Sequence, residues 1–163
     1  MLFAPFLATA LSALTPREAI AQHAYLIGTW KCSFTVGDEG GNYTTTWSQI
    51  LDATWLEQTY DQPQQERAPY FKAQYFVGYD PGHNQWVRFG AMTTGQYFLI
   101  RMTDTPGGWG WKYSGIFSTR PEPSDYDTVF TRVSDSYYTV DGPSYPNAKG
   151  VTVTEHHQCR KAM

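Results

Sequence analysis

The residues best suited to chemistry gather near the C-terminus of the chain. Glu155, His156, His157 and Cys159 occur there, and a second cysteine, Cys32, lies near the other end. Carboxylates and imidazoles act as general acids and bases, and imidazoles and thiolates also bind zinc. Successive residues of a strand point to opposite faces, so His156 and His157 cannot both face Cys159. We therefore expect no metal at this cluster.

The chain has 2 cysteines in all. Two thiols alone cannot complete a four-ligand zinc site, and in an oxidising compartment such a pair forms a disulfide. We predict that Cys32 and Cys159 are joined, bridging the first and last strands. The bridge would close a loop of about 127 residues, for which chain entropy gives a stabilisation of at most roughly 4–5 kcal/mol.

The predicted disulfide also fixes which strand faces point inward. Around Cys32, the residues Trp30 and Phe34 alternate with polar residues, so their face is interior. If Cys159 shares that face and no bulge intervenes, Glu155 and His157 also point inward.

An interior Glu155 and His157 allow more than one interpretation. A buried carboxylate is costly unless it is paired or hydrogen-bonded. The two residues are either polar contacts of a mainly apolar ligand site, or an acid–base pair, or structural groups satisfied by tyrosine hydroxyls, an arginine or water. Arg132 is the candidate arginine, because we expect its strand to point Phe130 and Arg132 into the interior.

The rest of the sequence predicts an all-β fold. After residue 25, turn signals recur every eight to twelve residues or so between alternating segments, as in sandwiches and barrels. About ten strands in meander order favour a closed antiparallel barrel, because closure removes exposed edges. Such a barrel can enclose a small ligand. The predicted strands are 25–36, 42–51, 54–60, 70–79, 85–92, 96–102, 109–118, 125–133, 136–140 and 151–160.

One short helix is expected before the first strand. Thr15 is suited to an N-cap, Pro16 to the first helical position and Glu18 to the third. We expect this helix to run to about Tyr25 and to cap one end of the barrel.

Aromatic residues make up 17% of the chain and alternate along several predicted strands. Such walls form either a packed core or a ligand cage. The candidate ligand-lining residues are Trp30, Phe34, Trp47, Tyr75, Phe89, Phe98, Trp111, Tyr113, Phe130, Arg132, Glu155 and His157.

The N-terminal segment resembles a secretory signal. Residues 2–11 form an apolar run too short to span a bilayer, and small-x-small sites follow at 8–10 and 19–21. We expect residues 1–21 to be a signal-peptide remnant and 22–163 to be the barrel domain, secreted or periplasmic. The alternative is a short N-terminal helix that stays attached.

Other functional classes find little support in the sequence. The net charge is -3 and no run of Lys or Arg occurs, which argues against a nucleic-acid partner. No stretch is long enough to predict a membrane span. Phosphate-binding glycine loops and the common hydrolase, metalloprotease and redox motifs are missing, so no reaction can be named.

The segment Gly28-Thr29-Trp30 resembles the G-x-W signature that opens the first strand of calycins, which include lipocalins and fatty-acid-binding proteins. The resemblance implies that Trp30 lies in the base of the barrel, covered by an arginine near the end of the last strand. Arg160 matches that arginine in sequence position, although strand parity places it outward.

The chain is also similar to an uncharacterised bacterial secreted family with a Gly-Thr-Trp-x-Cys first strand. The similar segments are 28–32, 78–87, 130–139 and 159–161. This similarity implies the barrel and export. More distantly, the chain resembles nitrobindin-like haem barrels, in which His157 would be the axial ligand. Their glycine-rich first strand is replaced here by residues 31–34.

The leading hypothesis is a secreted, lipocalin-like protein that binds a small apolar or amphipathic molecule inside the barrel, without a cofactor. One alternative is a haem protein or a small enzyme that uses His157. Another is a packed barrel that acts through its surface. An open lumen favours binding, whereas a lumen filled by Trp30, Phe34, Trp47 and Trp111 excludes it.

Overall fold

The computed structural model describes residues 14–105, 107–112, 116–117, 127–146 and 150–163. Two short helical segments precede the strands: α1 (Pro16–Ala21) and the 3₁₀ turn η1 (Ala24–Leu26). The strands are β1 (Gly28–Val36), β2 (Glu39–Ile50), β3 (Trp55–Gln62), β4 (Phe71–Asp80), β5 (Gln85–Met92), β6 (Tyr97–Thr105), β7 (Gly108–Lys112), β8 (Ile116–Phe117), β9 (Asp127–Ser134), β10 (Tyr137–Pro146) and β11 (Thr152–Lys161).

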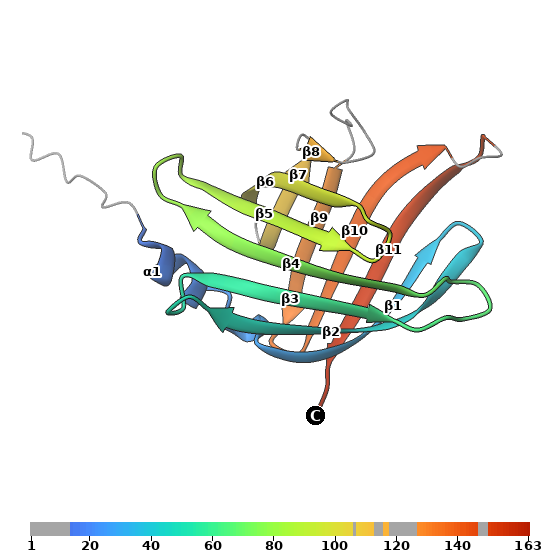
Figure 1. The fold of residues 1–163 in the computed structure, drawn as a ribbon, viewed down its shortest axis with the longest axis horizontal. Coiled ribbons are helices and arrows are strands. Elements are labelled where there is room, and N and C mark those ends of the chain that lie inside the picture. Colours follow the sequence, from blue (N-terminus) through green and yellow to red (C-terminus); the bar gives the residue numbers. More distant parts are fainter. Residues whose placement is uncertain (1–13, 106, 113–115, 118–126, 147–149) are drawn as a thin grey trace, which may run out of the picture.

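Ten of these strands form a closed antiparallel ring (Figure 1). Hydrogen bonding runs in the order β5-β4-β3-β2-β1-β11-β10-β9-β7-β6, and β6 pairs with β5 to close the barrel. β1 lies between β2 and β11, so the first and last strands are neighbours. The two-residue β8 pairs with β6 on the edge that also carries β7, further along the strand. The predicted closed barrel is therefore confirmed.

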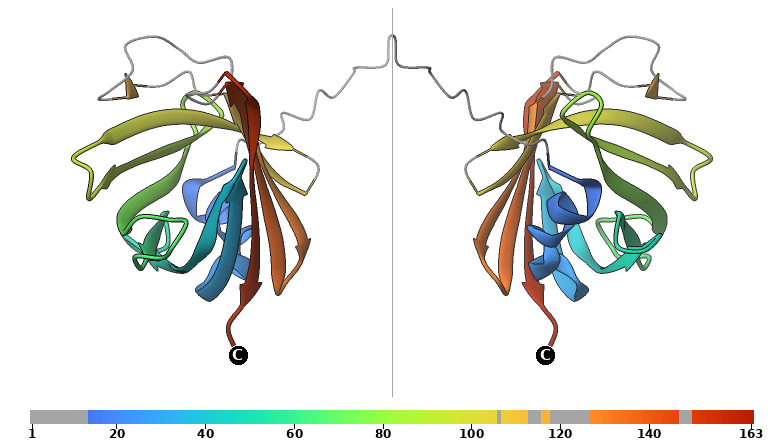
Figure 2. Two further views of the ribbon diagram at one scale, coloured as in Figure 1. Left: turned by 90° about the vertical axis from the view of Figure 1, so that its right-hand side faces the viewer. Right: turned by 90° about the vertical axis from the view of Figure 1, so that its left-hand side faces the viewer.

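The helix α1 begins where the sequence predicts it and closes one end of the barrel. Thr15 and Glu18 form a capping box, and Pro16 occupies the first turn. α1 packs against β3 and β4, and its Ala19 and Ile20 are fully buried. It ends at Ala21, sooner than expected. Figure 2 shows this blue segment between the orange-red and the teal-green walls of strands.

Tightly packed aromatic residues fill the half of the lumen next to α1, which we call the floor. Trp30, Trp86 and Trp109 are almost completely buried there, and Tyr138 packs on Trp30 with ring centroids 4.7 Å apart. Because interiors pack at crystal-like density, this half leaves little room for a ligand.

The cation that covers Trp30 is not the expected one. Arg160 is exposed and lies over the ring of Tyr137 on the outer face. Lys161 instead points inward, 5.5 Å from the Trp30 ring centroid, and donates to the Tyr25 carbonyl oxygen at 2.9 Å. Strand parity therefore placed Arg160 correctly, and the match of Arg160 to the calycin arginine is wrong.

Phe89 was expected inside the barrel but lies on its outer face. In β5, Trp86 and Arg88 take the inward positions, so Phe89 points outward and is 38% exposed. It stacks there on Phe76 and meets the edge of Trp55. The prediction assumed that the aromatic Phe89 would point inward rather than the charged Arg88, and the structure has the reverse.

Several strand boundaries also differ from expectation. The first strand begins at Gly28, and residues 25–26 belong to the 3₁₀ turn. The strand expected over 109–118 is divided into β7 and β8, and the one expected over 136–140 continues to Pro146. Within the described ranges, neither helical segment has the length and apolarity needed to cross a membrane.

Candidate functional site

The predicted disulfide is present and sets the register of the site. Cys32 in β1 lies directly opposite Cys159 in β11, and their sulfur atoms are bonded. Both cysteines are buried, so both side chains point inward as predicted. No register shift interrupts the pairing of β1 with β11, and the inward parity therefore carries over to His157 and Glu155.

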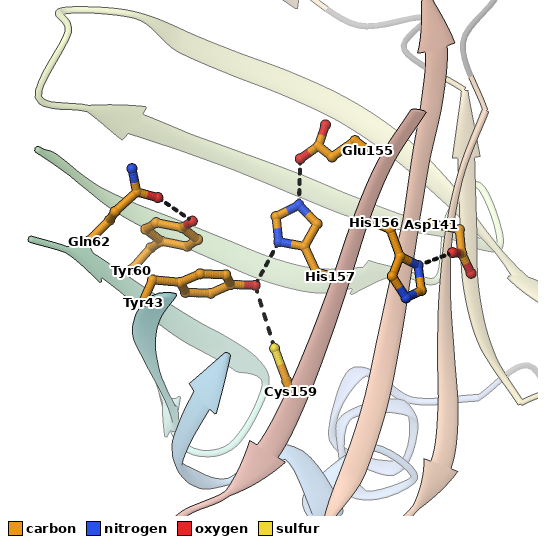
Figure 3. Close-up of polar contacts among 8 residues, drawn as sticks. All are labelled: Tyr43, Tyr60, Gln62, Asp141, Glu155, His156, His157 and Cys159. Carbon is orange, nitrogen blue, oxygen red and sulfur yellow. Dashed lines mark hydrogen bonds and ion pairs between the residues drawn. The ribbon is translucent and has the colours of Figure 1, made fainter. Parts of the chain in front are cut away.

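Glu155, His157 and Tyr43 form a hydrogen-bonded chain in the lumen (Figure 3). The Oε1 atom of Glu155 lies 2.5 Å from Nε2 of His157, and Nδ1 of His157 lies 2.9 Å from the Tyr43 hydroxyl. With the imidazole proton on Nε2, His157 donates to Glu155 and accepts from Tyr43. The Tyr43 hydroxyl also lies 3.5 Å from the Cys159 sulfur, so the chain sits directly on the disulfide.

Two stacked tyrosines form the wall facing this chain. The rings of Tyr43 and Tyr60 are 4.0 Å apart between centroids, and the Tyr60 hydroxyl donates to the Gln62 side chain at 3.0 Å. Burial raises the pKa of both tyrosines well above the usual value, and neighbouring groups, including Glu155, raise them further. Both hydroxyls therefore stay protonated near neutral pH, which makes them hydrogen-bond donors rather than nucleophiles.

His156 points away from the lumen, as strand parity predicts. Its Nδ1 atom lies 2.5 Å from the Asp141 carboxylate on the outer face of β10 and β11 (Figure 3). His156 and His157 thus belong to opposite surfaces of the barrel wall. This arrangement separates the residues of the apparent His-His-x-Cys motif.

Arg132 was expected inside as a partner for Glu155, and this prediction is wrong. Its guanidinium pairs with Asp135 and lies 4.2 Å from the Tyr25 ring centroid at the closed end of the barrel. β9 and β10 pair Arg132 with Tyr138, whereas Glu155 lies much nearer the other end of the neighbouring strand β11. The distance along the strands, and not the face, separates the two charges.

The remaining predicted lining residues divide between two levels. Trp30, Trp47 and Phe130 are buried in the floor. Tyr75 and Phe98 are also buried, and both pack on the guanidinium of Arg88. The side chain of Trp111 and the whole of Tyr113 lie outside what the structure describes.

Phe34 marks a second level that we call the mouth. It stacks on His157 with 5.7 Å between centroids, and unlike the floor residues it is only partly buried. The partly exposed inward-facing residues that we assign to the mouth are Phe34, Tyr60, Phe71, Met92, Val140, Glu155 and His157. These side chains of the mouth are thus partly exposed, whereas Trp30, Trp47 and Phe130 in the floor are buried.

A polar chain that the sequence did not reveal crosses the middle of the lumen. Arg88 donates to Gln58 at 2.9 Å, Gln58 donates to Thr45 at 3.0 Å, and Thr45 donates to the Thr59 carbonyl oxygen at 2.7 Å. The hydrogen bond to Gln58 and the Tyr75 ring stabilise the guanidinium of Arg88 in its inward position. Gln58 and Gln62 point inward from β3 and interrupt the alternation of apolar and polar residues. The inward face of β3 therefore could not be predicted from its sequence.

The buried position of His23 was also not predicted from the sequence. It lies between α1 and η1, stacks on Trp109 with 4.0 Å between centroids and contacts the edge of Trp86. Burial, with a smaller contribution from Arg132, lowers the pKa of His23 to about 4. The imidazole is therefore neutral in the folded protein at neutral pH.

This burial predicts acid sensitivity. In the unfolded chain His23 binds a proton below its ordinary pKa of 6.5. In the folded protein it binds one only when the pH falls to about 4. The free energy of unfolding should fall as pH drops from 6.5 to 4, by about 2–3 kcal/mol from this group. Urea denaturation of wild type and His23→Phe at pH 7 and pH 4 measures this as the difference between their pH dependences. Identical pH dependences would contradict the assignment.

A groove of about 360 Å³ lies on the outer face of the barrel. The side chains of Lys31 and Arg160 at its edge are exposed, and Pro63 contributes from the β3–β4 loop. It lies behind the wall that carries the disulfide. If the barrel acts through its surface, as in the alternative hypothesis, this groove is the candidate contact site.

The mouth does not fit a haem as it stands. An axial ligand needs a free imidazole nitrogen, and both nitrogens of His157 are hydrogen-bonded, to Tyr43 and to Glu155. The filled floor also limits the depth available to a flat macrocycle.

The fold and the site together define a closed ten-stranded antiparallel barrel with a filled floor and a partly exposed mouth, in which apolar side chains surround the chain of Tyr43, His157 and Glu155. This architecture is consistent with a calycin-like fold. Comparison of the chain with models of known protein families and with curated proteins finds no match.

Proposed function

We propose that this protein is a secreted barrel that binds a small, partly apolar molecule at the mouth of its lumen. One observation carries the proposal: the inward-facing Phe34, Glu155 and His157 stay partly exposed, while Trp30, Trp47 and Phe130 in the floor are buried. Apolar walls with a few convergent polar groups are typical of small-molecule sites. Here Glu155, His157 and Tyr43 supply those polar groups.

The packed floor limits the size of the ligand. Trp30 and Trp47 occupy the depth that a long chain would need, and the disulfide with Tyr43 lies just above them. The ligand is therefore expected to be short, to stay above the disulfide and to carry at least one hydrogen-bonding group.

Export fits both the disulfide and the N-terminal segment. Disulfides persist in oxidising compartments. Cleavage after Ala21 would remove Ala19 and Ile20, which are fully buried against the barrel. Cleavage after Ala10 would keep α1 intact, so we favour that position for a secreted or periplasmic mature chain.

Blocking the mouth tests the proposal. N-phenyl-1-naphthylamine, a neutral probe whose fluorescence rises in apolar surroundings, should bind the wild type. Val140→Trp fills the mouth from β10 and should weaken binding by at least about tenfold, equivalent to about 1.4 kcal/mol. Thr139→Trp, on the outward-facing neighbour of Val140, is the matched control and should bind as the wild type does. Equal binding by both variants and the wild type would refute a site at the mouth.

A further inference from the structure

Glu155 is held in a fixed position at the mouth. Its Oε1 atom is bonded to His157, and its side chain remains 31% exposed, so solvent and small molecules can reach it. The neighbouring His157 side chain is much less exposed, and Phe34 covers its ring. A ligand arriving at the mouth therefore meets the carboxylate before the imidazole.

The strand next to Glu155 makes room for the carboxylate. β10 pairs Asp141 with His156 and Ser144 with Thr154, so two residues of β10 lie opposite Glu155 alone. This is a β-bulge, a device that redirects side chains at functional sites.

Glycine is required at the first residue of this bulge. A Cβ atom on Gly142 would lie 2.7 Å from the Cβ atom and 3.0 Å from the Oε2 atom of Glu155. The second residue, Pro143, has no backbone N–H to leave unpaired. The sequence of β10 thus favours the observed position of Glu155.

The other side chains of the mouth suit a positive charge. Phe34 stacks on His157, the hydrogen-bond partner of Glu155, and Tyr60 meets Phe71 edge to face with 5.3 Å between centroids. The inward cation Arg88 is held by Gln58 and by the Tyr75 ring. Aromatic faces combined with a carboxylate attract organic cations and disfavour anions.

We propose that the ligand of the mouth is a small organic ammonium, with its charge at Glu155 and its apolar body against the rings of Phe34 and Tyr60. This inference rests on the proposed function and names the ligand class. The ammonium N–H groups donate to Oε2 of Glu155, while Oε1 keeps its bond to His157. A charged hydrogen bond of this kind contributes more than a neutral one.

Three probes of matched size test the inference: 2-phenylethylammonium, 2-phenylethanol and 3-phenylpropionate. Isothermal titration of the wild type should rank them in that order of affinity. Glu155→Gln should weaken the ammonium by about 10–100-fold, because a hydrogen bond to a charged group is worth roughly 1.5–3 kcal/mol. The alcohol should be unaffected. Glu57→Gln, which removes an outward-facing carboxylate of β3, is the control and should change none of the three affinities.

The outcomes separate this inference from the proposed function. Equal affinities for the ammonium and the alcohol in the wild type overturn the ammonium assignment, even if Glu155→Gln fails to fold. Loss of ammonium binding in Glu57→Gln as well as in Glu155→Gln overturns it too. In both cases the proposed function stands if Val140→Trp still blocks the naphthylamine probe, and it falls if that block is absent.

Discussion

Replacing Cys32 and Cys159 together by alanine should lower the free energy of unfolding by about 4 kcal/mol. The bridge spans 127 residues and joins β1 to β11, the two strands that close the ring between the chain ends. Without it, the unfolded chain gains the conformational freedom that the loop removes. Since small domains are stable by only about 5–15 kcal/mol, this loss is a large share of the total.

Urea denaturation measures the effect. The midpoint should fall and the slope should rise, because an unfolded chain without the crosslink exposes more surface. Wild type unfolded and refolded under reducing conditions should match the double variant of Cys32 and Cys159. An unchanged midpoint in the variant would show that β1 and β11 are held together without the bridge.

Trp30→Ala should destabilise the protein by about 3–5 kcal/mol, as expected for the loss of a large aromatic residue from a packed core. The Trp30 side chain is fully buried and donates from its indole nitrogen to the Leu26 carbonyl oxygen at 2.7 Å. Its ring also packs on Tyr138 and lies beneath Lys161. The substitution leaves a cavity at the centre of the floor and removes the donor for Leu26.

Trp55 provides a matched control for this substitution. It lies on the outer face, where its ring covers Gly78, and it is only partly buried. Thermal unfolding should show that Trp55→Ala costs less than half as much as Trp30→Ala. Equal costs at the two tryptophans would mean that the floor does not dominate the stability of the barrel.

The face of each strand could be predicted wherever one clear signal existed. The alternation around Cys32 and the disulfide to Cys159 correctly placed Glu155 and His157 inside. The capping pattern at Thr15 correctly placed the start of α1. The alternation in β1 and the capping pattern are local signals, and the disulfide carries the parity of β1 over to β11.

Errors arose where the outcome depends on contacts between strands. Arg88 is inside and Phe89 outside, because Gln58 and Tyr75 stabilise the cation and Phe76 covers the phenylalanine. These partners lie on other strands and cannot be inferred from β5 alone.

The height of a residue along the barrel axis also could not be predicted from the sequence. Arg132 lies on a strand of the expected parity but at the closed end, because the register of β9, β10 and β11 decides how far it lies from Glu155. The bulge at Gly142 also could not be foreseen, since it is defined only by the pairing with β11.

The most direct test of the account is to locate a bound probe by NMR. Titration with N-phenyl-1-naphthylamine should shift the amide signals of Phe34, Tyr60, Val140 and His157. The indole signal of Trp55, beside the outer aromatic cluster with Phe76 and Phe89, should not move. Shifts confined to Trp55 and its neighbours, or to the groove at Lys31 and Arg160, would contradict a binding site inside the mouth of the barrel.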